Sequence, residues 1–246
     1  MSSQSSPSQS PSPQFHLYSY FRSSCAGRLR IALNLKQLHH TTTFVNLLKG
    51  EQLSDAHRSL NPSATVPVLA VTAKDDSNTH SPDSTTNTET AFPITQSIAA
   101  LEYLEDIATQ PALLPPVSAP QLRARVRTLV NIIACDIQPV TNLRIQKKVK
   151  AFGGDNTAWA CELNVDGFTA LEKLVSQWAG TYCVGDAVTL ADVCLVPAVW
   201  AAQRVEVDFS PYPTVKAVFE RLEGLEAVQK AHWSRQPDTP EEMRRG

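Results

Sequence analysis

The 246-residue sequence lacks several features that mark common protein classes. It has no run of about 20 apolar residues, which a membrane-spanning helix needs. Its five cysteines form no C-x-x-C pair and no Cys–His spacing typical of zinc sites. Basic residues are not in excess, because the net charge is −2. These absences argue against a membrane protein, a metal centre and a nucleic-acid-binding protein.

The two ends of the chain lack targeting signals. Residues 1–14 are mainly Ser, Gln and Pro without an apolar stretch, so they do not form a secretory signal and predict a disordered tail. They also lack the arginine spacing of a mitochondrial presequence, and the chain ends in Arg-Arg-Gly, which is not a peroxisomal signal. An odd number of cysteines fits reduced thiols, so we expect a cytoplasmic protein. We expect every cysteine except Cys25 to fill an apolar core.

The first 110 residues alternate between strand and helix patterns. Aromatic and β-branched runs predict strands at 15–20, 41–45, 66–71 and 91–94, and apolar residues at helical spacing follow the first and the fourth of them. The order βαβ and then two strands and a helix predicts an α/β thioredoxin-like domain over 15–110, whose first two strands are parallel. The polar stretch 72–90 predicts a mobile insert.

After a proline-rich stretch at 111–120, which predicts a linker, the patterns are helical only. They predict an all-helical domain over 121–246. Thr189 followed by Asp192 resembles a capping box at the start of a helix that contains Pro197, which we expect to bend it. Arg123, Arg125 and Arg127 alternate with apolar residues and are interpreted as a solvent-facing helix surface.

Three short segments combine the residue types that a peptide-like ligand needs. Arg22-Ser23-Ser24-Cys25 opens a helix, where unpaired N–H groups and a partial positive charge stabilise an anion or a thiolate. Val66-Pro67 lies at the start of the third strand and fits the cis-proline of thioredoxin-like folds, where the residue before proline exposes its backbone N–H and C=O. Gln96-Ser97 opens the next helix and could hold a carboxylate. For both helix starts, the simpler interpretation is a helix cap.

Together these segments resemble the zeta class of glutathione transferases. The resemblance extends from Phe15 to Pro240 and rests on LYSYFRSSCAGRLRIAL, NLLKGEQLS, LNPSATVPVL, ITQSIAALEYLE, IQPVTNL, YCVGDAVTLADVCLVP, DFSPYPTV and RQPDTP. It implies a glutathione transferase fold, glutathione as cofactor and a homodimer. It also implies the isomerisation of maleylacetoacetate to fumarylacetoacetate in aromatic amino acid catabolism. The chain departs from the class in its tail, in its insert, at Gly27, which should loosen the first helical turn, and at Pro93.

The resemblance also assigns roles to residues. Ser23, with Ser24 and Cys25, would activate the glutathione sulfur, and Arg204 would bind a substrate carboxylate. The other assignments concern glutathione itself: Gln52 at its glycyl end, Val66 at its cysteinyl backbone, Gln96 and Ser97 at its γ-glutamyl group, and Gln138 and Asn142 on one helix face toward the cleft. On its own, Arg204 would be interpreted as an exposed surface residue.

Several alternatives remain open. Tyr18 or Tyr20 could act in place of the serines, although strand tyrosines more often serve packing. Cys25 could form a mixed disulfide with glutathione. The enzyme could be a broader conjugase or dehalogenase for small α-halo acids, and the chain could be a non-catalytic interaction module.

Overall fold

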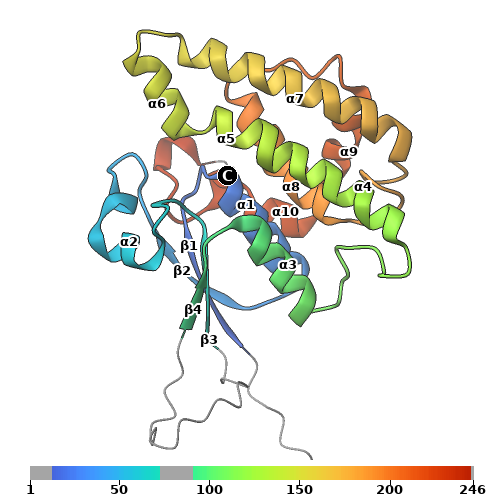
Figure 1. Cartoon of the computed structure of the whole chain (residues 1–246), viewed down its shortest axis with the longest axis horizontal. Coiled ribbons are helices and arrows are strands. Elements are labelled where there is room, and N and C mark those ends of the chain that lie inside the picture. Colours follow the sequence, from blue (N-terminus) through green and yellow to red (C-terminus); the bar gives the residue numbers. More distant parts are fainter. Residues whose placement is uncertain (1–12, 73–90, 245–246) are drawn as a thin grey trace, which may run out of the picture.

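The computed structural model describes residues 13–72 and 91–244 (Figure 1). The predicted insert at 72–90, apart from Thr72, lies outside these residues, as does the predicted tail up to residue 12. Gln14, which was assigned to the tail, is instead the first residue of a strand and pairs with Thr72. The predicted fold class is confirmed, because a mixed sheet with helices is followed by helices alone.

The sheet contains four strands in the order β2-β1-β3-β4. They are β1 (Gln14–Ser19), β2 (His40–Phe44), β3 (Val68–Thr72) and β4 (Ala91–Ile94). β1 and β2 are parallel, as predicted, whereas β3 is antiparallel to both β1 and β4. Because β4 is at the edge of the sheet, it accommodates Pro93, whose nitrogen cannot donate to a neighbouring strand.

The helices of this half are α1 (Ser24–Leu35), α2 (Asp55–Leu60) and α3 (Ser97–Ile107), with a 3₁₀ turn, η1, at Glu51–Leu53. α1 contacts α3 and also α8 and α10 of the second half. Most of α1 is therefore buried, including the charged residues Arg28 and Arg30. This central position places the start of α1 between the two halves of the molecule.

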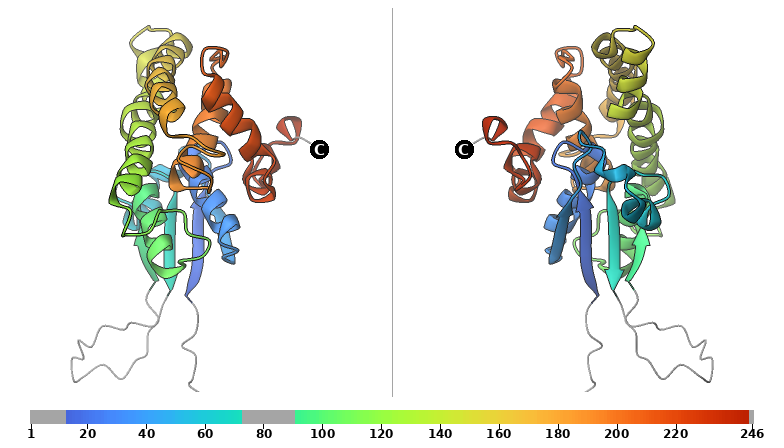
Figure 2. Two further views of the ribbon diagram at one scale, coloured as in Figure 1. Left: turned by 90° about the vertical axis from the view of Figure 1, so that its right-hand side faces the viewer. Right: turned by 90° about the vertical axis from the view of Figure 1, so that its left-hand side faces the viewer.

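The helical half occupies the upper part of Figure 1, above the strands. It contains α4 (Pro120–Asn131), a π-helical segment η2 (Ile132–Ile137), α5 (Gln138–Thr141), α6 (Leu143–Ala151), α7 (Asn156–Trp178), α8 (Leu190–Gln203), α9 (Pro213–Glu223), α10 (Glu226–Ala231), and the 3₁₀ turns η3 (Trp233–Arg235) and η4 (Glu241–Met243). α8 is buried along most of its length and starts with the predicted Thr189–Asp192 capping box. Figure 2 shows the C-terminal residues, in red, on the side of the molecule opposite α4 and α7.

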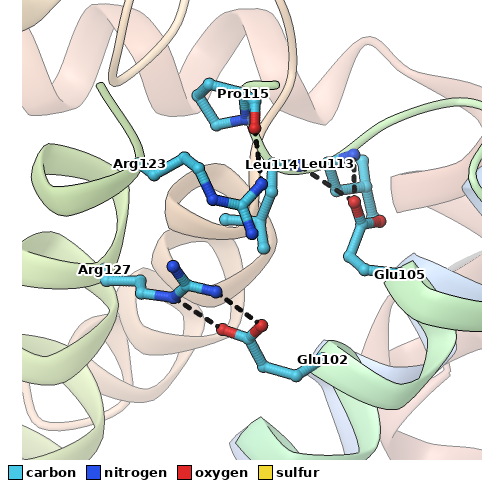
Figure 3. A network of polar contacts seen from close by, with 7 residues as sticks. All are labelled: Glu102, Glu105, Leu113, Leu114, Pro115, Arg123 and Arg127. Atoms are coloured by element: carbon cyan, nitrogen blue, oxygen red, sulfur yellow. Dashed lines mark hydrogen bonds and ion pairs between the residues drawn. The ribbon is translucent and has the colours of Figure 1, made fainter. Parts of the chain in front are cut away.

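The segment between the halves is more firmly held than a linker pattern suggests. Leu113 and Leu114 are buried, and their N–H groups both donate to one carboxylate oxygen of Glu105, at 3.0 Å (Figure 3). Lys36, which is also buried, forms an ion pair with Glu105 at 2.6 Å. The segment therefore fixes the start of the helical half against α1 and α3.

The interpretation of the α4 arginines as a purely solvent-facing surface is wrong. Arg127 donates two hydrogen bonds to Glu102 on α3, and Arg123 donates to the Pro115 carbonyl (Figure 3). The Arg125 guanidinium lies over the Trp178 ring, 5.6 Å from its centroid. Alternation with apolar residues could not reveal these contacts, because their partners come from α3, α7 and the linker.

The cysteines are divided between the core and the surface. Cys183 and Cys194 are buried and Cys161 is half-buried, whereas Cys135 is exposed. The prediction that Cys135 fills the core is therefore wrong. Ile133 and Ile137 of the same helical segment are buried, so Cys135, two residues from each, points away from the core.

Candidate active site

The turn between β1 and α1 presents Ser23. The Ser23 N–H donates to the Tyr20 carbonyl at 2.9 Å and closes the turn. The Ser23 Oγ accepts the Ala26 N–H at 3.1 Å, so this serine caps α1. The cap uses only an acceptor position of the hydroxyl, and the O–H remains able to donate to a ligand. The capping interpretation and the functional one are therefore compatible.

Ser24 and Cys25 form the first turn of α1, and both are half-buried. N–H groups of a first helical turn point out of the helix end and have no partner within the helix. A thiolate or carboxylate placed there would meet these donors and the positive end of the helix dipole. The structure thus places all three predicted residues at one helix terminus.

The bond between Val66 and Pro67 is cis, as predicted, and lies just before β3. The Val66 side chain is buried in a small apolar cluster with Tyr20, Phe21 and Val45. Within residues 13–72 and 91–244, the Val66 N–H and C=O have no hydrogen-bond partner. The cluster brings this free backbone next to the turn that carries Ser23.

Ser97 is the first residue of α3 and is buried, whereas Gln96 before it is exposed and forms no capping bond with its side chain. The Ser97 Oγ accepts a hydrogen bond from Arg28 at 3.1 Å. The Ser97 hydroxyl therefore has its own hydrogen free to donate. This bond joins the start of α3 to the first turns of α1.

Arg28 was missed by the sequence analysis. It is only 2% exposed, forms no ion pair with any carboxylate that the structure describes, and has an Nε atom without a hydrogen-bond partner. A buried guanidinium without a counter-charge favours an anion nearby. The sequence offered no signal, because an arginine in a helix is usually a surface residue.

The three remaining predicted glutathione ligands are less closely connected to α1. Gln52 lies in η1, and its buried Oε1 has no partner among the described residues.

The prediction that Gln138 and Asn142 share one helix face is wrong. α5 ends at Thr141, and Asn142 is extended and caps α6 by accepting the Ile145 N–H at 3.0 Å. Asparagine at this position favours a helix cap over continued helix, which spacing alone cannot show.

Arg204 follows the last residue of α8 and donates to the Trp200 carbonyl at 3.0 Å. It is half-buried and is not the exposed residue that its sequence position suggested. Burial, and then the positive charge of Arg22, lower the pKa of Arg204 to about 10. Arg22 is next to Ser23 in the sequence, and it lies near enough to Arg204 for its positive charge to act there. Arg22 was assigned no role from the sequence, although its place next to Ser23 was a signal.

Tyr20 is buried beside the two arginines and stacks edge-on against Phe21. Burial raises the pKa of the Tyr20 hydroxyl, which disfavours its phenolate form. A phenol that keeps its own proton cannot act as the base that accepts a proton from a thiol. Its packing in the apolar cluster supports the interpretation of Tyr20 as a structural residue.

Among the residues that the structure describes, no group of three or more His, Cys, Asp or Glu side chains is arranged to hold a metal ion. No helix in this part of the chain is long and apolar enough to cross a membrane.

Comparisons with known proteins place the chain in a family. Residues 22–107 match the glutathione S-transferase N-terminal domain, and residues 166–226 match the glutathione S-transferase C-terminal domain. A probable glutathione S-transferase of Coccidioides immitis is 59% identical over 94% of this chain and 98% of its own. The maleylacetoacetate isomerase maiA of Aspergillus fumigatus is 54% identical over 96% of this chain and 97% of its own.

Two solved structures have the same fold. A bacterial maleylpyruvate isomerase, described as a glutathione S-transferase of the zeta class, is 38% identical and has a TM-score of 0.79, covering 92% of this chain and all of its own. A maleylacetoacetate isomerase of Anaeromyxobacter dehalogenans with bound glutathione is 39% identical. It has the same TM-score of 0.79 and covers 93% of this chain and 99% of its own. The chain therefore belongs to the glutathione S-transferase family and, within it, to the zeta class.

Proposed function

We propose that the chain catalyses the glutathione-dependent isomerisation of maleylacetoacetate to fumarylacetoacetate. The observation that carries the proposal is that Arg22 directly precedes Ser23, while Arg204, half-buried at the end of α8, lies within reach of its positive charge. Neither arginine forms an ion pair with a carboxylate among residues 13–72 and 91–244. Two unpaired cations beside a thiolate site suit a substrate that carries carboxylates, and a guanidinium binds a carboxylate in a bidentate manner.

The residues present fit glutathione. The buried Gln52 Oε1 and the free backbone of Val66 offer hydrogen-bond positions that a peptide ligand can fill. Ser97, oriented by the buried Arg28, offers a hydroxyl hydrogen to the γ-glutamyl carboxylate. When bound, glutathione supplies a thiolate that adds reversibly to the cis double bond, so that this bond can rotate while it is single.

The start of α1 would keep the sulfur ionised. Lowering a thiol pKa from about 8.5 to near 7 requires about 2 kcal/mol of thiolate stabilisation. A helix terminus contributes about 0.3–1 kcal/mol, and each hydrogen bond to a charged group contributes about 1.5–3 kcal/mol. The Ser23 hydroxyl, with Ser24 and Cys25 beside it, supplies donors of this kind. Arg204 and Arg22 would hold the carboxylates of the diacid while its central bond rotates.

Further parts of the proposal rest on the family resemblance. Gln96 would act with Ser97, and Gln138 and Asn142 would line the cleft from separate helices. Residues 15–110 would form the glutathione-binding domain and residues 121–246 the substrate domain, with 111–120 as linker. The protein would work as a cytoplasmic homodimer in the catabolism of phenylalanine and tyrosine.

Purified protein mixed with glutathione and maleylacetone tests the proposal. We expect the absorbance of the cis isomer to disappear only when glutathione is present, and the glutathione concentration to stay constant. Stoichiometric consumption of glutathione would identify a conjugase instead. Absence of turnover on maleylacetone, in a preparation that binds glutathione, would overturn the proposal.

A further inference from the structure

Phe21, in the turn that presents Ser23, is held at both of its peptide groups. Its N–H donates to the Asp238 Oδ2 at 2.8 Å, and its carbonyl accepts from the Arg30 guanidinium at 3.1 Å. Asp238 lies 217 residues further along the chain. The C-terminal segment therefore returns to the turn on which the chemistry depends.

Arg30 extends this attachment. It is buried and also donates to the Ser19 hydroxyl at 3.1 Å, to the Tyr20 carbonyl at 3.4 Å and to the Ala231 carbonyl at 3.1 Å. The negative charge of Asp238 lies close enough to stabilise the Arg30 guanidinium. The end of β1, the turn and the C-terminal end of α10 thus share one buried cation.

The same C-terminal segment also covers the turn with apolar side chains. Tyr20, Phe21, Val45 and Val66 form a small cluster, and Trp233 and Met243 pack against it. Val66 is the residue whose free backbone precedes the cis-proline. The segment thus supports both parts of the chain that would contact the sulfur-bearing residue of glutathione.

Residues 233–244 are fixed internally. The Thr239 hydroxyl donates to the Trp233 carbonyl at 2.5 Å, and Arg244 donates to the carbonyls of Thr239 and Pro237 at 3.0 Å. Gln236 ties the segment to the residues just before it, because it donates to the carbonyls of Lys230 and His232 at 2.9 Å. A segment held by these hydrogen bonds can keep the turn in one place.

We propose that residues 233–244 act as a strap that fixes the Tyr20–Ser23 turn, and that Asp238 is its positioning residue. Within the turn, the Ser23 N–H donates to the Tyr20 carbonyl. Because this bond closes the turn, a tilt of the Phe21 peptide groups moves Arg22 and Ser23 together. A displacement of about 1 Å at a reacting group can cost about 100-fold in rate. The effect on turnover rests on the proposed isomerisation, whereas the effect on the mobility of the turn does not.

Three variants test the strap: Asp238→Ala, Asp238→Asn and, as a matched control, Asp208→Ala. Asp208 is exposed and accepts hydrogen bonds from Ser210 in its own turn. We would measure kcat and KM with maleylacetone, glutathione affinity by calorimetry, thermal unfolding, and amide hydrogen exchange of the peptide containing Phe21.

For Asp238→Ala we expect kcat/KM to fall by about tenfold or more per folded molecule, as loss of a charge-assisted hydrogen bond predicts. Exchange of the Phe21 amide should become faster, and Asp238→Asn should recover most of the activity, because its amide oxygen still accepts. Asp208→Ala should match the wild type in all four measurements.

Two results would overturn the proposal. The first is Asp238→Ala with unchanged kcat/KM, glutathione affinity and Phe21 exchange. The second is a loss of activity that follows only the loss of folded protein, because Asp238 would then support the fold and not the turn. If the wild type lacked isomerase activity, faster exchange at Phe21 with weaker glutathione binding would still support the strap.

Discussion

Gly27 of α1 and Pro197 of α8 approach so closely that a Cβ atom added to Gly27 would lie 3.0 Å from the Pro197 Cβ. The expectation that Gly27 loosens the first turn of α1 misses this contact. Glycine is present because a larger side chain would push the two helices apart. The contact also sets the distance between the Ser23 end of α1 and α8, which carries Arg204 at its end.

Replacing Gly27 with alanine should therefore destabilise the protein. Alanine gains about 1 kcal/mol from its higher helix propensity, but overpacking of a core contact costs about 1–3 kcal/mol. We expect a net loss of about 1 kcal/mol in the free energy of unfolding, and a larger loss for Gly27→Val. Urea denaturation measures both. A more stable Gly27→Ala would contradict the packing argument.

Features set by neighbouring residues were predictable from the sequence. The strands, the parallel first pair, the Thr189 cap and the helix start at Ser23 all depend on residues within one element or one βαβ unit. Contacts between distant residues were not predictable. Arg28 meets Ser97, and Asp238 meets Phe21, across 69 and 217 residues. No local pattern distinguishes a buried arginine or aspartate from an exposed one.

Two glutamates of α3 offer a second test, because they hold the junction between the halves in different environments (Figure 3). Glu105 faces the buried Lys36, whereas the Glu102–Arg127 pair is over one-third exposed on both sides. We expect Glu105→Gln to cost about 3–5 kcal/mol, because it leaves a buried ammonium unpaired. Glu102→Gln should cost at most about 1 kcal/mol. Equal costs in urea denaturation would contradict the burial argument.

Ser23→Ala should lower kcat/KM by about 100-fold or more, since it removes a preorganised donor to the sulfur. It also removes the cap of α1, which costs about 1 kcal/mol of stability. Asp155→Ala is the matched control, because Asp155 caps α7 in the same way. The control should lose similar stability but keep its activity.

Cys25→Ala should bind glutathione more weakly yet still turn over. An inactive Cys25→Ala beside an active Ser23→Ala would support covalent thiol chemistry instead.

Asp238 should contribute more to the free energy of unfolding as pH falls. Burial raises the pKa of the Asp238 carboxyl, and this outweighs the opposing effects of the Phe21 N–H and of Arg30. The folded chain therefore binds this proton more tightly than the unfolded chain does. Its contribution to the free energy of unfolding is largest below the unfolded pKa and is lost as pH rises through the folded one. Relative to Asp238→Asn, the wild type should therefore gain stability as pH falls through the folded pKa of Asp238 toward its unfolded one. Urea denaturation of both proteins would measure this, and a constant difference would refute it.

Arg204 separates an isomerase for diacids from a general conjugase. If Arg204 binds a substrate carboxylate, Arg204→Ala removes a charge-assisted contact worth about 1.5–3 kcal/mol, or about 10- to 150-fold in kcat/KM for the diacid. Arg204→Lys should recover only part of this, because an ammonium lacks the planar fork of a guanidinium. Conjugation of an uncharged aryl halide should change little. Both substrates would be measured on the same preparations. Equal losses on both would mean that Arg204 supports the end of α8 through its bond to Trp200, and no loss on either would leave Arg22 as the carboxylate ligand.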